Sequence, residues 1–157
     1  SFVSKKMPTF KSFATSSLAD IYGEKELKAS YHKQVYQFKS GYALNNGKGS
    51  FIFKELPNTA QIGPTMSFVF ADVNKDGNQD VIGVGGIYES EVETIRYDSN
   101  IGYILIGDSK GNLKPYKDIN FYNGENAKQM KKIQIKSKQH LLIANNNAQV
   151  SLFSISK

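Results

Sequence analysis

The stretch Asp72-Val73-Asn74-Lys75-Asp76-Gly77-Asn78-Gln79-Asp80 carries an oxygen-bearing side chain at every second position. Gly77 stands where the chain must turn sharply, and glycine adopts a positive φ at low cost. Carboxylates converging on so tight a loop repel one another unless a hard cation lies among them. Ca²⁺ is the natural candidate, because it accepts six to eight oxygen ligands at about 2.3–2.6 Å with flexible geometry. We therefore predict a calcium loop over 72–80, with ligands from the side chains of Asp72, Asn74, Asp76 and Asp80 and the carbonyl oxygen of Asn78.

The flanks of this loop predict strands and exclude an EF-hand. An EF-hand loop ends in a bidentate Glu at its twelfth position and lies between helices. Counted from Asp72, the twelfth position is Gly83. Residues 66–70 and 81–84 are rich in β-branched and aromatic side chains, which indicates strands. The loop is thus expected to join two strands, and a polar hairpin turn without metal is the alternative interpretation.

The remaining pattern is typical of a mainly β chain with one short helical segment at the N-terminus. Over 8–29, apolar residues recur at helical spacing, as at Phe10, Phe13 and Leu18. Pro8 and Thr9 are start signals, Gly23 is a stop signal, and 24–30 could add a short second turn. Beyond residue 32, short apolar runs alternate with Gly and Asn turns. We predict a helical segment over 1–31 and a β region over 32–157, with strands at 35–38, 40–44, 50–54, 66–70, 81–84, 103–106, 112–116, 131–136, 140–144 and 149–155.

The stretch 72–82 resembles the calcium loop of FG-GAP/VCBS repeats, which build integrin-like β-propellers. The resemblance extends to Gly85-Gly86-Ile87-Tyr88, to 102–108 and to Lys110-Gly111-Asn112-Leu113, and upstream to 45–51. It implies two to three propeller-type blades, a partial propeller, in the C-terminal part of a secreted bacterial VCBS repeat-containing protein. A faint internal repeat, 46–51 against 108–113, fits blades of short strands.

Composition restricts the environment in which such a chain works. The sequence has 157 residues and no cysteine, which suits one β domain without disulfides or thiol chemistry. No run of eighteen apolar residues is present, so we expect no membrane span. Weak calcium sites fill where Ca²⁺ is about millimolar, outside the cell. We therefore expect an extracellular or cell-surface protein, with its signal peptide on a part of the protein upstream of Ser1.

The charge pattern does not favour a nucleic-acid partner. The formal net charge is +6 and almost all positive charge is lysine, with Arg96 as the single arginine. Nucleic-acid readers use clustered arginine for bidentate and stacking contacts. Lys132, Lys136 and Lys138 would share one strand face, where lysines discourage edge-to-edge pairing.

Together these features predict a calcium-binding extracellular β-propeller segment that serves binding, adhesion or scaffolding and is not an enzyme. Its expected partners are an extracellular protein or glycan, the remainder of a parent propeller, or a second copy paired through open strand edges. Arg96 is expected to pair with Asp98 or a nearby glutamate and to order residues 87–100.

Two alternatives belong to another class. The chain could be a carbohydrate-binding or carbohydrate-active module of a larger secreted enzyme. In the first case a sugar would contact the calcium beside Tyr88 or Tyr97. In the second, two of the acids Glu89, Glu91, Glu93 and Asp98 would flank a glycosidic bond. A solvated strand face explains the alternating glutamates equally well.

Overall fold

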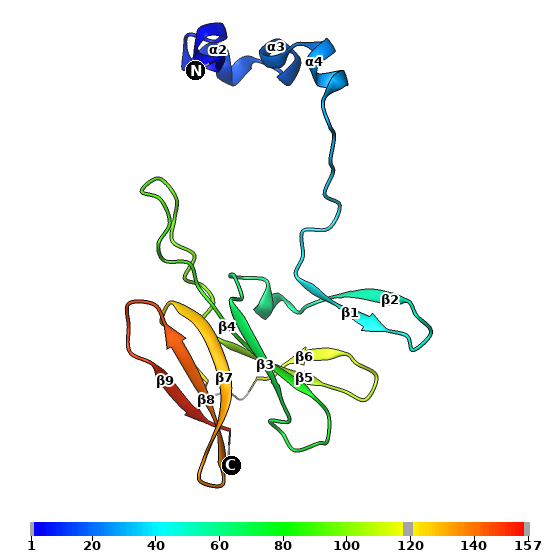
Figure 1. Cartoon of the computed structure of the whole chain (residues 1–157), viewed down its shortest axis with the longest axis vertical. Helices are drawn as coiled ribbons and strands as arrows, with labels where there is room; N and C mark the ends of the chain where they lie inside the picture. The colour runs from blue at the N-terminus through cyan, green and yellow to red at the C-terminus, as the bar shows by residue number, and fades with distance from the viewer. Residues whose placement is uncertain (1, 118–120, 156–157) are drawn as a thin grey trace. The chain divides into compact units, whose positions relative to one another are not determined.

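A computed structural model describes residues 2–117 and 121–155 of the chain. The chain divides into two compact units, Ser1–Phe38 and Lys39–Lys157. The first unit is helical and the second consists of β-sheets joined by turns (Figure 1). A mainly β fold with a short helical segment at the N-terminus, as predicted, is confirmed at this level.

The described residues of the first unit form four short helices, α1 (Phe2–Lys6), α2 (Phe10–Thr15), α3 (Leu18–Tyr22) and α4 (Glu24–Ala29), rather than one helix up to Gly23 followed by a short turn over 24–30. Ser17 breaks the expected helix because its side chain accepts the backbone N–H of Asp20, which starts α3 with a capping box. Gly23, at φ 92°, ends α3. Ile21 is the only buried residue among those described in this unit. No helix of the described residues has the length and apolar character needed to cross a membrane.

The described residues of the second unit form three antiparallel sheets. Residues 35–38, which precede it and were predicted as a strand, have no regular secondary structure. The strands are β1 (Gly41–Asn45) and β2 (Phe51–Glu55) in the first sheet; β3 (Ser67–Ala71), β4 (Asp80–Val84), β5 (Tyr103–Gly107) and β6 (Leu113–Pro115) in the second; and β7 (Ala127–Ile135), β8 (Lys138–Asn145) and β9 (Ser151–Ser154) in the third. A 3-10 helix, η1 (Asn58–Ala60), follows β2.

In the four-stranded and the three-stranded sheet, neighbouring strands follow one another in the chain, in the orders β3-β4-β5-β6 and β7-β8-β9. The arrangement of the sheets as propeller blades stays a prediction.

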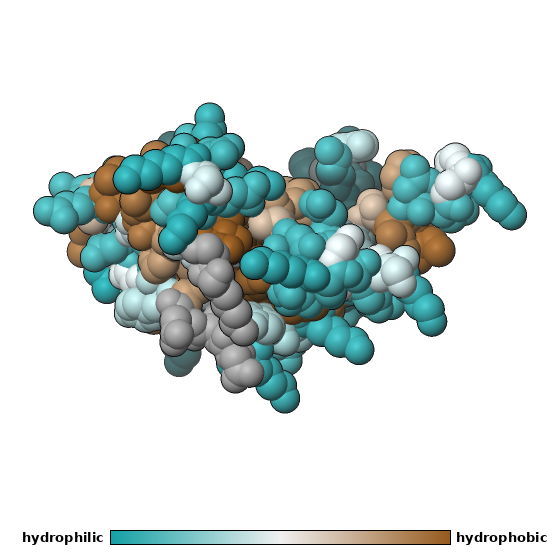
Figure 2. All heavy atoms as spheres, turned by 90° about the horizontal axis from the view of Figure 1, so that it is seen from below, coloured by the Kyte–Doolittle hydropathy of each residue, from teal (hydrophilic) through white to brown (hydrophobic). Residues whose placement is uncertain are grey.

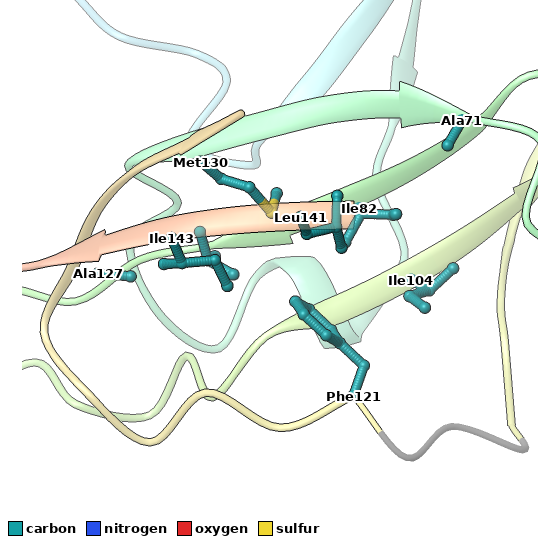
Figure 3. Close-up of a cluster of buried hydrophobic side chains, with 9 residues drawn as sticks. Ala71, Ile82, Ile104, Phe121, Ala127, Met130, Leu141 and Ile143 are labelled. Carbon is teal, nitrogen blue, oxygen red and sulfur yellow. The ribbon is translucent and has the colours of Figure 1, made fainter. Parts of the chain in front are cut away.

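The main core lies between the four-stranded and the three-stranded sheet. Ile82 and Ile104 come from the first of these sheets, and Met130, Leu141 and Ile143 from the second (Figure 3). The hydroxyl of Ser67 accepts the backbone N–H of Met130 at 3.0 Å, which fixes β3 beside β7. This packing holds the β3–β4 hairpin against the three-stranded sheet.

The opposite face of the four-stranded sheet is covered less completely. Val81, Tyr103 and Leu105 are buried there with Ala60, and the ring of Tyr103 lies where a Cβ at Gly83 would be. Large apolar side chains nevertheless remain exposed in this unit, and Figure 2 shows hydrophobic residues reaching the surface between hydrophilic ones. This open face forms part of the site described next.

Candidate metal centre

The predicted calcium loop joins β3 to β4 and is closed by the pair Ala71 and Asp80 at the strand ends. Gly77 has φ 85°, so the positive φ expected from the sequence is confirmed. Lys75 also has a positive φ, 61°, which is unfavourable for a residue with a Cβ by roughly 1–2 kcal/mol. Two left-handed residues in one short loop fold its backbone back on itself and bring its side chains together.

Asp72 and Asp76 organise the loop through backbone donors. The carboxylate of Asp72 accepts the N–H of Asp76 at 3.1 Å and the N–H of Gly77 at 3.0 Å. The carboxylate of Asp76 accepts the N–H of Asn78 at 2.8 Å and the side-chain amide of Asn74 at 2.8 Å. Three of the predicted ligands, Asp72, Asn74 and Asp76, are therefore gathered at the loop tip.

These hydrogen bonds also set the charge of the tip. The Asn74 amide, followed by the Asn78 backbone N–H, holds the pKa of the Asp76 carboxyl below its usual value. Asp76 is exposed and is therefore ionised across the neutral range. The loop presents anionic oxygen to solvent at a fixed place.

Asp80 has a different position from the other predicted ligands. Its side chain is fully buried, at 0% exposure. One carboxylate oxygen accepts the N–H of Val73 at 2.8 Å, and the other accepts the N–H of Gly107 at 2.9 Å. Asp80 thus anchors both the base of the loop and the end of β5. This structural role was missed from sequence, because the partner at Gly107 lies far along the chain.

The donor set fits a hard cation in its chemistry. All the predicted ligand atoms are carboxylate, amide or carbonyl oxygens, which Ca²⁺ prefers and Zn²⁺ sites seldom use alone. Across residues 2–117 and 121–155, however, no three Asp, Glu, His or Cys side chains form a group that could hold a metal ion. Asp72 and Asp76 lie at the tip and Asp80 lies at the base. A cation at the tip would take the place of the Asn74 amide beside Asp76 and would rely on amide and carbonyl oxygens for its remaining ligands.

A cleft of about 750 Å³ lies beside the loop. Residues 41–44 of β1 form one wall, and Phe68, Phe70, Val81 and Tyr103 of the four-stranded sheet contribute to the other. Residues 77–79 of the loop also line this cleft. The volume is in the range of ordinary ligand sites.

The β1–β2 hairpin is held over this cleft by the turn between β5 and β6. The hydroxyl of Tyr42 donates to the carbonyl of Gly111 at 2.8 Å, and the ammonium group of Lys54 donates to the side-chain oxygen of Asn112 at 2.7 Å. Gly111 has φ 72°, and a Cβ there would approach the Leu44 side chain closely. These contacts fix the position of the β1 wall.

The predicted pairing of Arg96 is confirmed. Its Nε and one terminal nitrogen lie 2.9 and 2.8 Å from the same carboxylate oxygen of Asp98, and its guanidinium lies 4.4 Å from the centre of the Tyr88 ring. An antiparallel bridge between Ile87 and Tyr97 lies at the base of the 87–97 segment. That the pairing orders residues 87–100 stays a prediction.

Glu89 holds the same loop to the third sheet. Its carboxylate accepts the side-chain amide of Asn126 at 3.0 and 2.8 Å and that of Asn146 at 2.5 Å. Glu91 accepts the hydroxyl of Thr94 at 3.0 Å. The side-chain oxygen of Asn126 is buried and has no hydrogen-bond partner among the described residues. Glu89 and Glu91, considered above as catalytic acids, thus both have structural partners.

No family model, curated protein or solved structure matches the chain. Function therefore has to be inferred from the residues and their geometry.

Proposed function

We propose that this chain is a calcium-binding β-module of the propeller type that works outside the cell in binding or scaffolding and carries out no catalysis. The observation that supports this most directly is the loop tip, where Asp72, Asn74 and Asp76 are brought together with an ionised carboxylate. Asp and Asn also accept backbone N–H groups in turns without metal, but the spacing Asp72-x-Asn74-x-Asp76-Gly77 is the one found in calcium loops.

In this proposal Asp72, Asn74, Asp76 and the Asn78 carbonyl hold the ion, and Asp80 supports the site from below. Bound Ca²⁺ supplies positive charge that offsets the repulsion between loop carboxylates. Since the unfolded chain cannot present this ligand set, the ion stabilises the folded state by mass action. Its role is structural, and it fixes the loop that borders the cleft.

An extracellular setting follows from the weakness expected of such a site. The described carboxylates do not form a group of three, so affinity rests partly on neutral oxygens. Sites with few charged ligands fall in the range of about 10⁻⁴–10⁻³ M, which Ca²⁺ occupies only outside the cell. The lysine-rich charge of the chain suits a protein or glycan partner rather than a nucleic acid.

The test is thermal unfolding in millimolar CaCl₂ and in EDTA, with MgCl₂ as the comparison ion. Millimolar Ca²⁺ is about one to ten times the expected dissociation constant and should stabilise the fold by about 0.4–1.4 kcal/mol. Asp76→Ala should abolish the shift, whereas Glu93→Gln, an exposed acid outside the loop, should retain it. Equal melting temperatures in CaCl₂ and EDTA for the unmodified chain would refute a calcium site.

A further inference from the structure

Strand β1 has one paired and one free edge. Among the described residues, it pairs with β2 alone. The N–H of Leu56 donates to the carbonyl of Ser40 at 3.0 Å, and the N–H of Asn46 donates to the carbonyl of Ser50 at 3.0 Å. These bonds place the even-numbered residues in the hydrogen-bonded pairs. In an antiparallel ladder the alternate residues then direct their N–H and C=O groups away from the partner, so those of Gly41 and Ala43 point to the free edge.

The free edge borders the cleft described above. Gly41, Tyr42, Ala43 and Leu44 all line it. Gly41 and Ala43 are exposed, whereas Tyr42 and Leu44 are half-buried toward the turn at Gly111. The unpaired polar groups of the β1 backbone are thus found at the wall of a largely apolar cavity. Unpaired backbone groups at a sheet edge are a template for pairing with another chain.

The facing wall offers apolar side chains. Phe68 is 58% exposed and Phe70 is 49% exposed, although both lie on a strand of the core sheet. Their rings meet edge to face with centroids 5.7 Å apart. A two-stranded hairpin such as β1–β2 is marginal by itself, and a third strand with an apolar face would complete it.

Part of the polar lining of the cleft is engaged within the protein: Tyr42 with Gly111, Asn112 with Lys54 and Asp108, and Thr65 with Tyr103. The backbone groups at the free edge of β1 are the polar groups that an extended chain can pair with in regular order. Asp108 is the only charged residue among the described residues that line the cleft. A neutral or basic occupant is therefore favoured over an acidic one.

We propose that an extended segment of a partner protein binds in this cleft as a third strand on the free edge of β1. Its backbone pairs with the N–H and C=O groups of Gly41 and Ala43. Its side chains in register with Tyr42 and Leu44 point toward the four-stranded sheet and pack on Phe68 and Phe70. The segment is apolar at alternate positions and neutral or basic overall, which is the β-strand-addition mode of peptide recognition. This binding does not require that the 72–80 loop holds calcium.

The probe is a fluorescein-labelled peptide of alternating valine and threonine with a lysine at each end, titrated with the full chain and followed by fluorescence anisotropy. A matched peptide carries N-methyl groups on the alternate amides that would face β1, so that side chains and charge are unchanged. N-methylation removes two hydrogen bonds and should weaken binding at least about tenfold. A third peptide with glutamate ends should bind more weakly than the lysine form.

The protein variants distinguish binding at this site from nonspecific hydrophobic binding of the peptide. Ala43→Pro removes an N–H at the free edge and leaves the bonds to β2 intact, so it should weaken binding at least about tenfold. Phe70→Ala should also weaken it, whereas Phe51→Ala, an exposed apolar residue outside the cleft, should not. Circular dichroism checks that each variant is folded.

No saturable binding up to about 1 mM peptide would overturn the proposal. Equal affinity for the N-methylated and the unmethylated peptide would show that the cleft binds apolar side chains without backbone pairing, which would also overturn the proposal. Concentration-dependent self-association that Ala43→Pro abolishes, without peptide binding, would assign the edge to a second copy. The titration is run in CaCl₂ and in EDTA. Peptide binding is thereby tested independently of the calcium site, even if calcium does not bind.

Discussion

The buried carboxylate of Asp80 accepts the backbone N–H of Gly107 at 2.9 Å, which ties the β3–β4 loop to the end of β5. Its other oxygen accepts the N–H of Val73 inside the loop. One side chain therefore holds the base of the proposed metal site and the edge of the cleft in a common frame. Because both bonds are made to backbone donors of the protein itself, we expect this frame to persist without an ion.

Asp80→Asn should destabilise the second unit in CaCl₂ and in EDTA alike. The amide group replaces one accepting oxygen by a donor that faces a backbone N–H in a buried place, which costs about 1–3 kcal/mol. Urea unfolding followed by circular dichroism measures the loss. Asp72→Asn is the matched control, since Asp72 is exposed and should affect mainly the response to calcium. A loss for Asp80→Asn that occurred only in CaCl₂ would make Asp80 a ligand rather than an anchor.

Asp72 and Asp80 differ in how much of their role could be predicted from the sequence. Alternating oxygens and Gly77 predicted the loop and its positive φ, and the flanks at 66–70 and 81–84 predicted its position between strands, because these features depend on neighbouring residues. The burial of Asp80 depends on β5, which lies beyond a long irregular segment. No local pattern encodes that contact. The same limit hid the cleft, which is formed by strands far apart in the sequence.

Gly83→Ala should destabilise the four-stranded sheet. A Cβ at this position would overlap the ring of Tyr103, which is buried on the sheet face. Overpacking of this kind costs typically about 1–3 kcal/mol. The double variant Gly83→Ala with Tyr103→Leu tests the cause, because removing the ring should relieve the clash and make the two effects less than additive. Strict additivity in urea unfolding would assign the loss to the backbone of Gly83 itself.

Acid should release the 87–97 loop through Glu89. Hydrogen bonds from the Asn126 amide first, and then from Asn146 with the nearby ammonium group of Lys128, lower the pKa of the Glu89 carboxyl below its usual 4.5. A lowered folded pKa means that this contribution to stability is fully present above about pH 4.5 and is lost as the pH falls through the folded value. Amide chemical shifts of Ile87 and Tyr97, which bond each other across the base of the loop, report the change.

Glu89→Gln should remove this acid transition from those two amides, and Glu93→Gln should leave it in place. Arg96→Ala is a second control, for the contribution of an exposed ion pair in the same loop to overall stability. Its ion pair with Asp98 is exposed, at 56% and 42% of the two side chains, so it should change overall stability little. An unchanged titration of Ile87 and Tyr97 in Glu89→Gln would show that another group controls the loop.

The number and bounds of the helices in the first unit were also only partly predictable from the sequence. Spacing at Phe10, Phe13 and Leu18 predicted the correct type of structure, and the stop at Gly23 with a short helix after it agrees with the prediction. The break at Ser17 was not predicted. It arises because the Ser17 side chain caps the N-terminus of α3. The apolar residues of these helices do not form a core, since Ile21 alone is buried among the described residues of this unit.

Removal of residues 1–38 should leave the second unit folded with little change in melting temperature. The first unit has helices of five or six residues, and helices this short are marginal without packing. Limited trypsin digestion should therefore cut first at lysines up to Lys39 and release a fragment that retains β circular dichroism. Lysines on the paired strands β7 and β8, such as Lys132, should be cut later, because a protease must first open their backbone. A drop in melting temperature of more than a few degrees on deletion would show that the helices stabilise the sheets.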